Sequence, residues 1–254
     1  MYKKREPVVA LTAIAVLGGC SGSSVVSGEL YPVENATNAV ASSANASGAF
    51  ATSSYTLSID NNTTAEITVD GTTHSMTRNS DGSFSNAATD VTMFVTSTIP
   101  GGPAEGDGDV FFIRIQDSSG AVNRVVVDAN GFNSVDSATT GSATYTGVAQ
   151  GFDASGASVT GTLTLTADFT DAATGLSGTI TGGHVGAPGA AFSLVPTGFG
   201  SAGSAFSTTL TSTDVAVSNS SMIGHFFEGG DRATGYYGIE ADGAATAGFF
   251  DAER

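Results

Sequence analysis

The chain has 254 residues and a formal net charge of −16, with 24 acidic residues, 8 basic residues and a single cysteine. Such an acidic chain repels nucleic acid, because phosphates are contacted chiefly by Arg and Lys, and it also repels anionic lipid headgroups. One cysteine excludes an intramolecular disulfide and a thiolate metal cluster. Abundant Gly, Ala, Ser and Thr suit short strands and tight turns better than packed helices.

Residues 1–19 have the pattern of a bacterial secretion signal. A positive cluster at residues 3–5 precedes an apolar run at residues 8–17 and two small residues, Gly18 and Gly19. The run has about half of the roughly 20 apolar residues that a membrane-spanning helix needs. We therefore predict a signal peptide over residues 1–19 rather than a permanent membrane helix.

The single cysteine, Cys20, directly follows this signal. Leu17-Gly18-Gly19-Cys20 resembles a bacterial lipobox, which implies diacylation of the Cys20 thiol and cleavage before it. Ser21 in the next position fits onward transport to the outer membrane in the lipoproteins that this segment resembles. Two or three acyl chains, at about 0.8 kcal/mol per buried methylene, would hold the protein firmly at a membrane. The alternative is an ordinary signal peptide cut elsewhere, with Cys20 as a bystander.

Removing residues 1–19 takes away three of the eight basic residues and one of the 24 acidic ones, which leaves five basic and 23 acidic residues. The rest of the chain contains no lysine. Residues 20–50 are rich in Ser, Ala, Asn and Gly without a sustained period, so we predict a flexible tether there. A helix over residues 33–46 is the alternative, which Asn and Ser interrupt.

Residues 51–136 show the period of two that is typical of strands. Tyr55, Leu57 and Ile59 alternate with polar residues, and the turn pairs Asp70-Gly71 and Asn130-Gly131 supply the positive φ of two-residue hairpins. Further alternating sets lie at residues 65–69, 91–95, 111–115 and 125–127. We predict a small antiparallel β handle domain.

Residues 137–254 are expected to form a second all-β domain. Leu163, Leu165, Ala167 and Phe169 share one face of a strand, and threonines occupy the other face. Further strands are predicted at residues 144–152, 176–181, 190–194, 204–211, 215–218, 222–228, 233–239 and 245–250. Strands at this spacing indicate a sandwich or a barrel, and closure into a barrel removes the exposed edges that a lysine-free chain cannot protect.

Three passages of this half resemble the β-barrel domain of the transferrin-binding-protein-B superfamily of surface lipoproteins. They are ATYTGVAQG, GTLTLTADFTDAATGLSGTI and GYYGIEADGAATAGFF, and the resemblance covers about residues 139–254. The second contains the family's Asp-Phe pair and Ser-Gly step, and the third resembles its closing hairpin, with Ile239 where the family commonly has Pro. The resemblance implies an eight-stranded antiparallel soluble barrel after a smaller handle, display at the cell surface, and a ligand held by loops.

Two sets of residues are candidate ligand sites. His184 lies in TGGHVGAPG, which we predict to be an exposed loop. If the chain resembles the haem-binding members of the superfamily, His184 would be an axial haem ligand. A solvated histidine is the simpler interpretation. Glu105, Asp107 and Asp109 alternate with glycines and are candidates for calcium. No EF-hand loop accompanies them, so a solvated acidic loop is favoured. His225, beside two phenylalanines, is expected to pack in the barrel.

Other motifs do not indicate catalysis. Residues 198–203 match Gly-x-Gly-x-x-Gly, but a strand rather than a helix is predicted after them, which argues against a dinucleotide site. Gly-x-Ser-x-Gly is absent from the sequence, and Cys20 is not available as a nucleophile. We expect neither an enzyme nor a cofactor.

The sequence therefore predicts a monomeric, lipid-anchored lipoprotein of the outer-membrane surface that captures an extracellular protein, an iron carrier or haem. The alternative is a structural or adhesive envelope lipoprotein with no specific soluble ligand. An integral outer-membrane barrel is a third possibility, which the Thr-rich strand faces and the lipobox disfavour.

Overall fold

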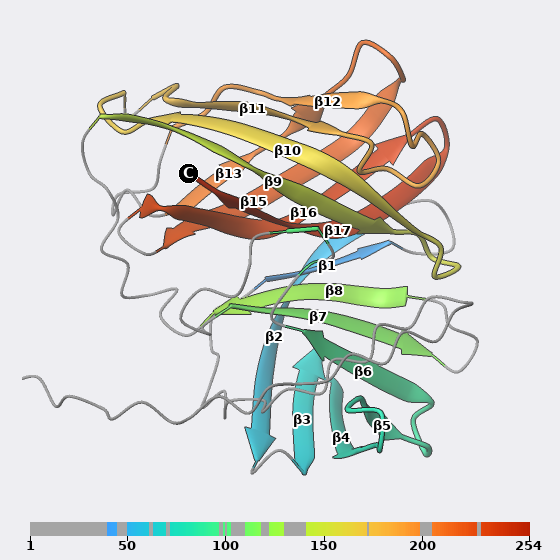
Figure 1. The fold of residues 1–254 in the computed structure, drawn as a ribbon. Coiled ribbons are helices and arrows are strands. Elements are labelled where there is room, and N and C mark those ends of the chain that lie inside the picture. The colour runs from blue at the N-terminus through green and yellow to red at the C-terminus, as the bar shows by residue number, and fades with distance from the viewer. Residues whose placement is uncertain are drawn as a thin grey trace, which may run out of the picture.

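The computed structural model of the chain is all-β. It describes residues 40–44, 50–60, 63–69, 72–96, 99, 101–102, 110–117, 122–129, 141–171, 173–198, 205–227 and 230–254. These residues form two antiparallel sheets, one from each half of the chain. Figure 1 shows the two sheets stacked one above the other.

The N-terminal sheet contains eight strands in chain order. They are β1 (Val40–Ala44), β2 (Phe50–Asp60), β3 (Thr64–Val69), β4 (Thr72–Arg78), β5 (Phe84–Asn86), β6 (Val91–Thr96), β7 (Val110–Asp117) and β8 (Val122–Ala129). β1 pairs with β2 and also with β8, so the pairing closes into a small barrel. This sheet takes the place of the predicted handle.

The C-terminal sheet contains nine strands, in the order β13-β15-β16-β17-β9-β10-β11-β12-β14. They are β9 (Ser142–Phe152), β10 (Ser158–Asp168), β11 (Leu176–Thr181), β12 (Ala191–Leu194), β13 (Ala205–Thr208), β14 (Leu210–Thr211), β15 (Val217–Phe227), β16 (Arg232–Ala241) and β17 (Ala244–Glu253). The sheet is a nearly closed antiparallel barrel.

The two ends of this sheet meet at one segment, because only Thr209 separates β13 from β14. β13 pairs with β15, whereas β14 pairs with β12. The Ser220 hydroxyl of β15 donates to Leu210 O and accepts from Leu210 N, each at 2.8 Å. The observed barrel therefore has nine strands where the sequence predicts eight, because residues 205–211 divide into β13 and β14.

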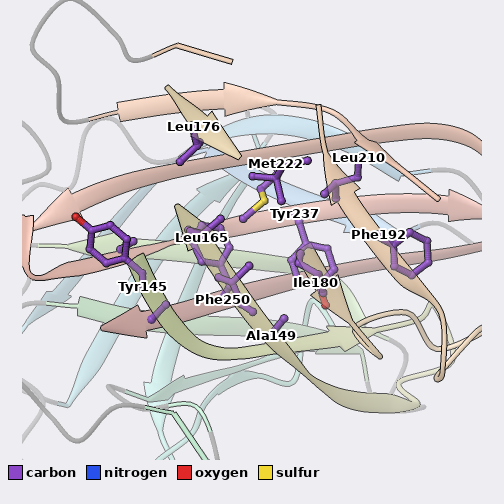
Figure 2. Close-up of a cluster of buried hydrophobic side chains, with 14 of the residues drawn as sticks. Tyr145, Ala149, Leu165, Leu176, Ile180, Phe192, Leu210, Met222, Tyr237 and Phe250 are labelled. Atoms are coloured by element: carbon purple, nitrogen blue, oxygen red, sulfur yellow. The ribbon is translucent and has the colours of Figure 1, made fainter. Parts of the chain in front are cut away.

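Alternating side chains fill the barrel interior. On β10, Leu163, Leu165 and Ala167 are at most 1 % exposed, and the threonines between them face solvent. Figure 2 shows how the core side chains of several strands converge in the interior. The largest fully buried side chains of this core are Tyr145, Tyr237, Phe192, Phe226 and Phe250.

The hairpin β16–β17 is buried on both faces. Its inner face belongs to the barrel core, and its outer face packs under the N-terminal sheet, where Phe249 lies 5.1 Å from Phe112 of β7 between ring centroids. The turn Asp242-Gly243 has φ values of 49° and 79°, as expected for a two-residue hairpin. Burial on both faces fits the many Ala, Gly, Tyr and Phe residues of this hairpin.

The structure corrects three sequence-based expectations. Val40–Ala44 is a strand, not part of a flexible tether or of a helix, because β2 and β8 pair with it on both sides. The predicted strands at residues 215–218 and 222–228 are one strand, β15, with a register shift between Val217 and Asn219. β4 and β5 were not predicted, because their apolar residues are too few to show a period.

Candidate functional site

One end of the C-terminal barrel carries four connections between strands. They are the turns at 153–157 and 242–243 and the loops at 182–190 and 212–216. Asp214 Oδ2 accepts from Ala191 N at 2.9 Å, and Asp242 Oδ1 accepts from Ala216 N at 3.2 Å. These hydrogen bonds join the loop at 212–216 to the start of β12 and to the turn at 242–243.

His184 lies inside this end, not on an exposed loop as predicted. Its side chain is 0 % exposed, and its ring lies 5.6 Å from the ring of Phe192 between centroids. Nε2 is 3.3 Å from Ala244 O, to which it donates in the Nε2–H tautomer. Burial lowers the pKa of His184, against smaller raising effects from the carbonyl groups of Ala244 and Ile239 and the charge of Asp242. The imidazole is therefore held neutral and enclosed.

A second polar group is buried on the outer face of the barrel. Arg232 Nε and Nη2 donate to the two carboxylate oxygens of Asp251 at 2.8 and 2.6 Å, and the two side chains are 3 % and 0 % exposed. Burial raises the pKa of Asp251, and the hydrogen bonds and charge of Arg232 oppose this rise. His225 shares this face, because it pairs with Thr234, which in turn pairs with Asp251. Burial lowers the pKa of His225 to about 4.

Arg114 of β7 joins the two sheets. Its guanidinium carbon lies 4.6 Å from the ring centroid of Phe94 in β6 and 5.4 Å from that of Phe152 in β9. Both distances are within the range of cation–π attraction. Desolvation lowers the pKa of Arg114, but guanidinium stays charged throughout the physiological range.

Three aspartates near the barrel ends stabilise their own turns. Asp168 Oδ1 accepts from the hydroxyl and the backbone N–H of Thr170, and Asp171 accepts from Thr174 in the same way. These bonds lower the pKa of both carboxyl groups. Asp153 forms the same kind of turn with Ser155. Their oxygens are thus already engaged by the chain.

Of the predicted site residues, His184 alone lies in the described part of the chain. Cys20 and the acidic set Glu105, Asp107 and Asp109 lie outside the described residues. Within the described ranges, no group of three or more His, Cys, Asp or Glu side chains is placed to hold a metal ion. After residues 198–203 the next described element is the strand β13, as predicted.

Sequence reasoning missed the Arg232–Asp251 pair and the enclosure of His184. The sequence offers only a weak signal for the pair: Arg232 is the one basic residue of hairpin 232–253, which also carries Glu240, Asp242, Asp251 and Glu253. For His184 no local signal existed, because its partner Ala244 is 60 residues away.

Comparison with known proteins does not assign the chain. No protein-family model matches it, and no curated protein matches its sequence. Among the described residues, no helix is both long and apolar enough to cross a membrane.

Proposed function

We propose that this chain is a lipid-anchored binding protein of the outer-membrane surface, built like the transferrin-binding-protein-B superfamily, which captures its ligand on loops of the barrel or on the N-terminal sheet. The observation that carries the proposal is the smaller all-β sheet seated on the outside of an antiparallel barrel, behind a lipobox. This is the order of parts that the resemblance over residues 139–254 implies.

The filled interior favours loops and outer surfaces as the place of binding. Bulky side chains such as Tyr237, Phe192 and Phe250 are packed inside the barrel with 0 % exposure. A haem at His184 would require the enclosing loop 182–190 to leave its place, so we assign an extracellular protein or an iron carrier as the principal ligand class. The acidic surface favours a partner with a basic face.

The anchor is tested first. Cells that express the full chain should yield a di- or triacylated N-terminal Cys20 fragment by mass spectrometry, and a Cys20→Ser variant should yield none. Shaving of intact cells should use a protease of broad specificity, because the chain after Cys20 offers trypsin no lysine and only five arginines. Cleavage of the body from outside supports a surface receptor, whereas an unacylated or fully protected protein contradicts it.

Ligand capture is tested on the same cells. Haemin and an iron-loaded carrier protein should be titrated onto cells with the wild-type chain and onto cells with Cys20→Ser. Saturable binding that disappears with the anchor supports the proposal. Acylated, externally cleavable protein without saturable binding would instead favour a structural or adhesive envelope component.

A further inference from the structure

The loop at 182–190 is packed into the barrel end by contacts with residues far away in sequence. Tyr237, which is fully buried, donates its hydroxyl to Gly183 O at 2.6 Å, and Val185 N donates to Thr246 Oγ1 at 3.0 Å. Gly182 N also bonds to Ala190 O at 2.9 Å, which closes the base of the loop. The loop therefore covers the interior like a lid, and we call residues 182–190 the lid.

His184 is the one ionisable side chain of the lid and is fully buried, and Ala187 and Ala190 of the lid also pack against the barrel core. A Cβ at Gly183 would lie 2.6 Å from Ile180 Cγ2, so the lid backbone is in direct contact with the core. A Cβ at Gly186 would lie 3.1 Å from His184 Cε1 and 2.8 Å from Ala244 Cβ. Because Gly186 has no side chain, the imidazole of His184 has room beside it.

The surroundings of the imidazole favour its neutral form, because desolvation outweighs the neighbouring groups that favour the protonated ring. Nε2–H donates to Ala244 O, and Nδ1 is buried without a hydrogen-bond partner among the described residues. An unpaired acceptor of this kind costs modest free energy, but a second N–H and a full positive charge in the same enclosure would cost far more. Protonation at Nδ1 would therefore oppose closure of the lid.

The facing groups compensate that charge only in part: the carbonyl groups of Ala244 and Ile239 and the charge of Asp242 favour the protonated ring, but desolvation outweighs them. Within the lid, residues 185–190 carry no ionisable side chain, and neither do Phe192 and Ser193 of β12 or residues 244–247 of β17. Tyr237 of β16 is neutral in this range, because burial raises its pKa. Glu240 is on the outer face of the barrel, and Asp153 is engaged in its own turn. Asp242 is the carboxylate whose charge acts on the ring, and it is solvent-exposed at the hairpin turn.

We propose that the lid is acid-sensitive: protonation of His184 releases residues 182–190 from the barrel end and exposes the apolar interior around Phe192 and Tyr237. The sign follows from linkage. In the open state His184 takes its ordinary pKa of 6.5, and closure lowers it. Closure is therefore fully favourable above pH 6.5 and weakens as the pH falls from 6.5 toward the lower pKa of the closed form. This inference is independent of the ligand and of the anchor.

Hydrogen exchange of the full chain, followed by mass spectrometry, tests the lid. Amides of residues 182–190 should be protected at about pH 8 and should lose protection at about pH 5, after correction for intrinsic rates, because protonation of His184 favours the open lid. In His184→Gln the amide nitrogen can still donate to Ala244 O but takes no proton, so protection should persist at both pH values. His225→Gln, which removes another histidine with a lowered pKa, should keep the acid response of the wild type.

Equal protection of the wild-type lid at both pH values would overturn the proposal, and so would an acid response in His184→Gln as large as that of the wild type. Gly186→Ala is a second variant, and its methyl group should release the lid at neutral pH. If His184→Gln fails to fold, NMR titration of the wild type decides: the His184 ring and the lid amides must share one midpoint below pH 6.5, and separate midpoints refute the coupling.

Discussion

Arg232 and Asp251 carry opposite charges that are almost completely withdrawn from water. Removing one partner of such a pair leaves the other charge buried, so Asp251→Asn should lower the free energy of unfolding by about 3–5 kcal/mol. Urea denaturation at neutral pH measures the loss.

The control is a second Arg–Asp pair in the same part of the molecule. Arg254 and Asp231 lie 3.7 Å apart, and their side chains are 49 % and 70 % exposed. Asp231→Asn should cost only about 0–1 kcal/mol, because exposed ion pairs gain little over hydration. Similar losses in the two variants would show that burial does not govern the strength of the Arg232–Asp251 pair.

Phe169 and Phe226 allow the loss of a half-buried ring to be compared with the loss of a fully buried one. The rings are 5.2 Å apart between centroids in an edge-to-face arrangement, but Phe226 is 0 % exposed, whereas Phe169 lies in the turn after β10 and is only partly buried. Phe226→Ala should therefore cost about 3–5 kcal/mol, and Phe169→Ala roughly half as much. Thermal or urea melts of the two variants give the ratio, and a larger loss for Phe169→Ala would contradict this assignment of the core.

At the scale of elements, the place where β14 meets β15, which we call the seam of the barrel, is held by a side chain rather than by paired backbone groups. Ser220 is the residue of β15 that bonds both backbone groups of Leu210. Ser220→Ala leaves those groups without this partner and should cost about 1–3 kcal/mol, with faster hydrogen exchange at Leu210 and Thr211. Ser218→Ala, at an exposed site on the same strand, should change stability by less than about 0.5 kcal/mol. Unchanged exchange at Leu210 would mean that the seam closes in another way.

Strands whose own side chains alternate could be predicted from the sequence, and strands defined by their neighbours could not. β10 was predicted because Leu163 and Leu165 alternate with threonines, and β11 was predicted at its observed bounds. β15 was predicted as two strands, because Asn219, Ser220 and Ser221 interrupt its apolar period. Its continuity comes from pairing with β16, which no local pattern records.

The same distinction holds for the candidate site. The loop around His184 was predicted correctly as a loop, but its burial was not, because Phe192 and Ala244 that enclose it lie on other elements. Likewise the sequence of β1, with its small and polar residues, resembles a linker. It forms a strand because it pairs with β2 on one side and with β8 on the other. Local composition predicts the secondary structure that a segment prefers, whereas contacts with residues distant in sequence determine the structure of β1 and the burial of His184.

At the scale of the whole molecule, the outer face of β15–β17 joins the two sheets. β1 lies directly against β16 and β17, and Figure 1 shows β1 and β8 beneath the hairpin that ends the chain. Ile223, Tyr236 and Phe249 form the apolar part of this face, and His225 and Asp251 lie in the neighbouring row. The junction therefore combines apolar contact with groups that acid would charge or neutralise.

His225 makes stability depend on pH across this junction. Its pKa falls from 6.5 to about 4 on folding because burial disfavours the charged ring. The unfolded chain therefore binds the proton more readily, and folding loses stability as the pH falls from about 6.5 to about 4, by roughly 3 kcal/mol in total. The difference in free energy of unfolding between wild type and His225→Gln, measured in urea at a series of pH values, isolates this contribution from that of the many carboxylates. It should be constant above pH 7 and should change steadily below 6.5, with the variant losing less stability than the wild type. A difference that stays flat down to about pH 4 would mean that the ring is hydrated in solution, and that the N-terminal sheet does not cover this face of the barrel.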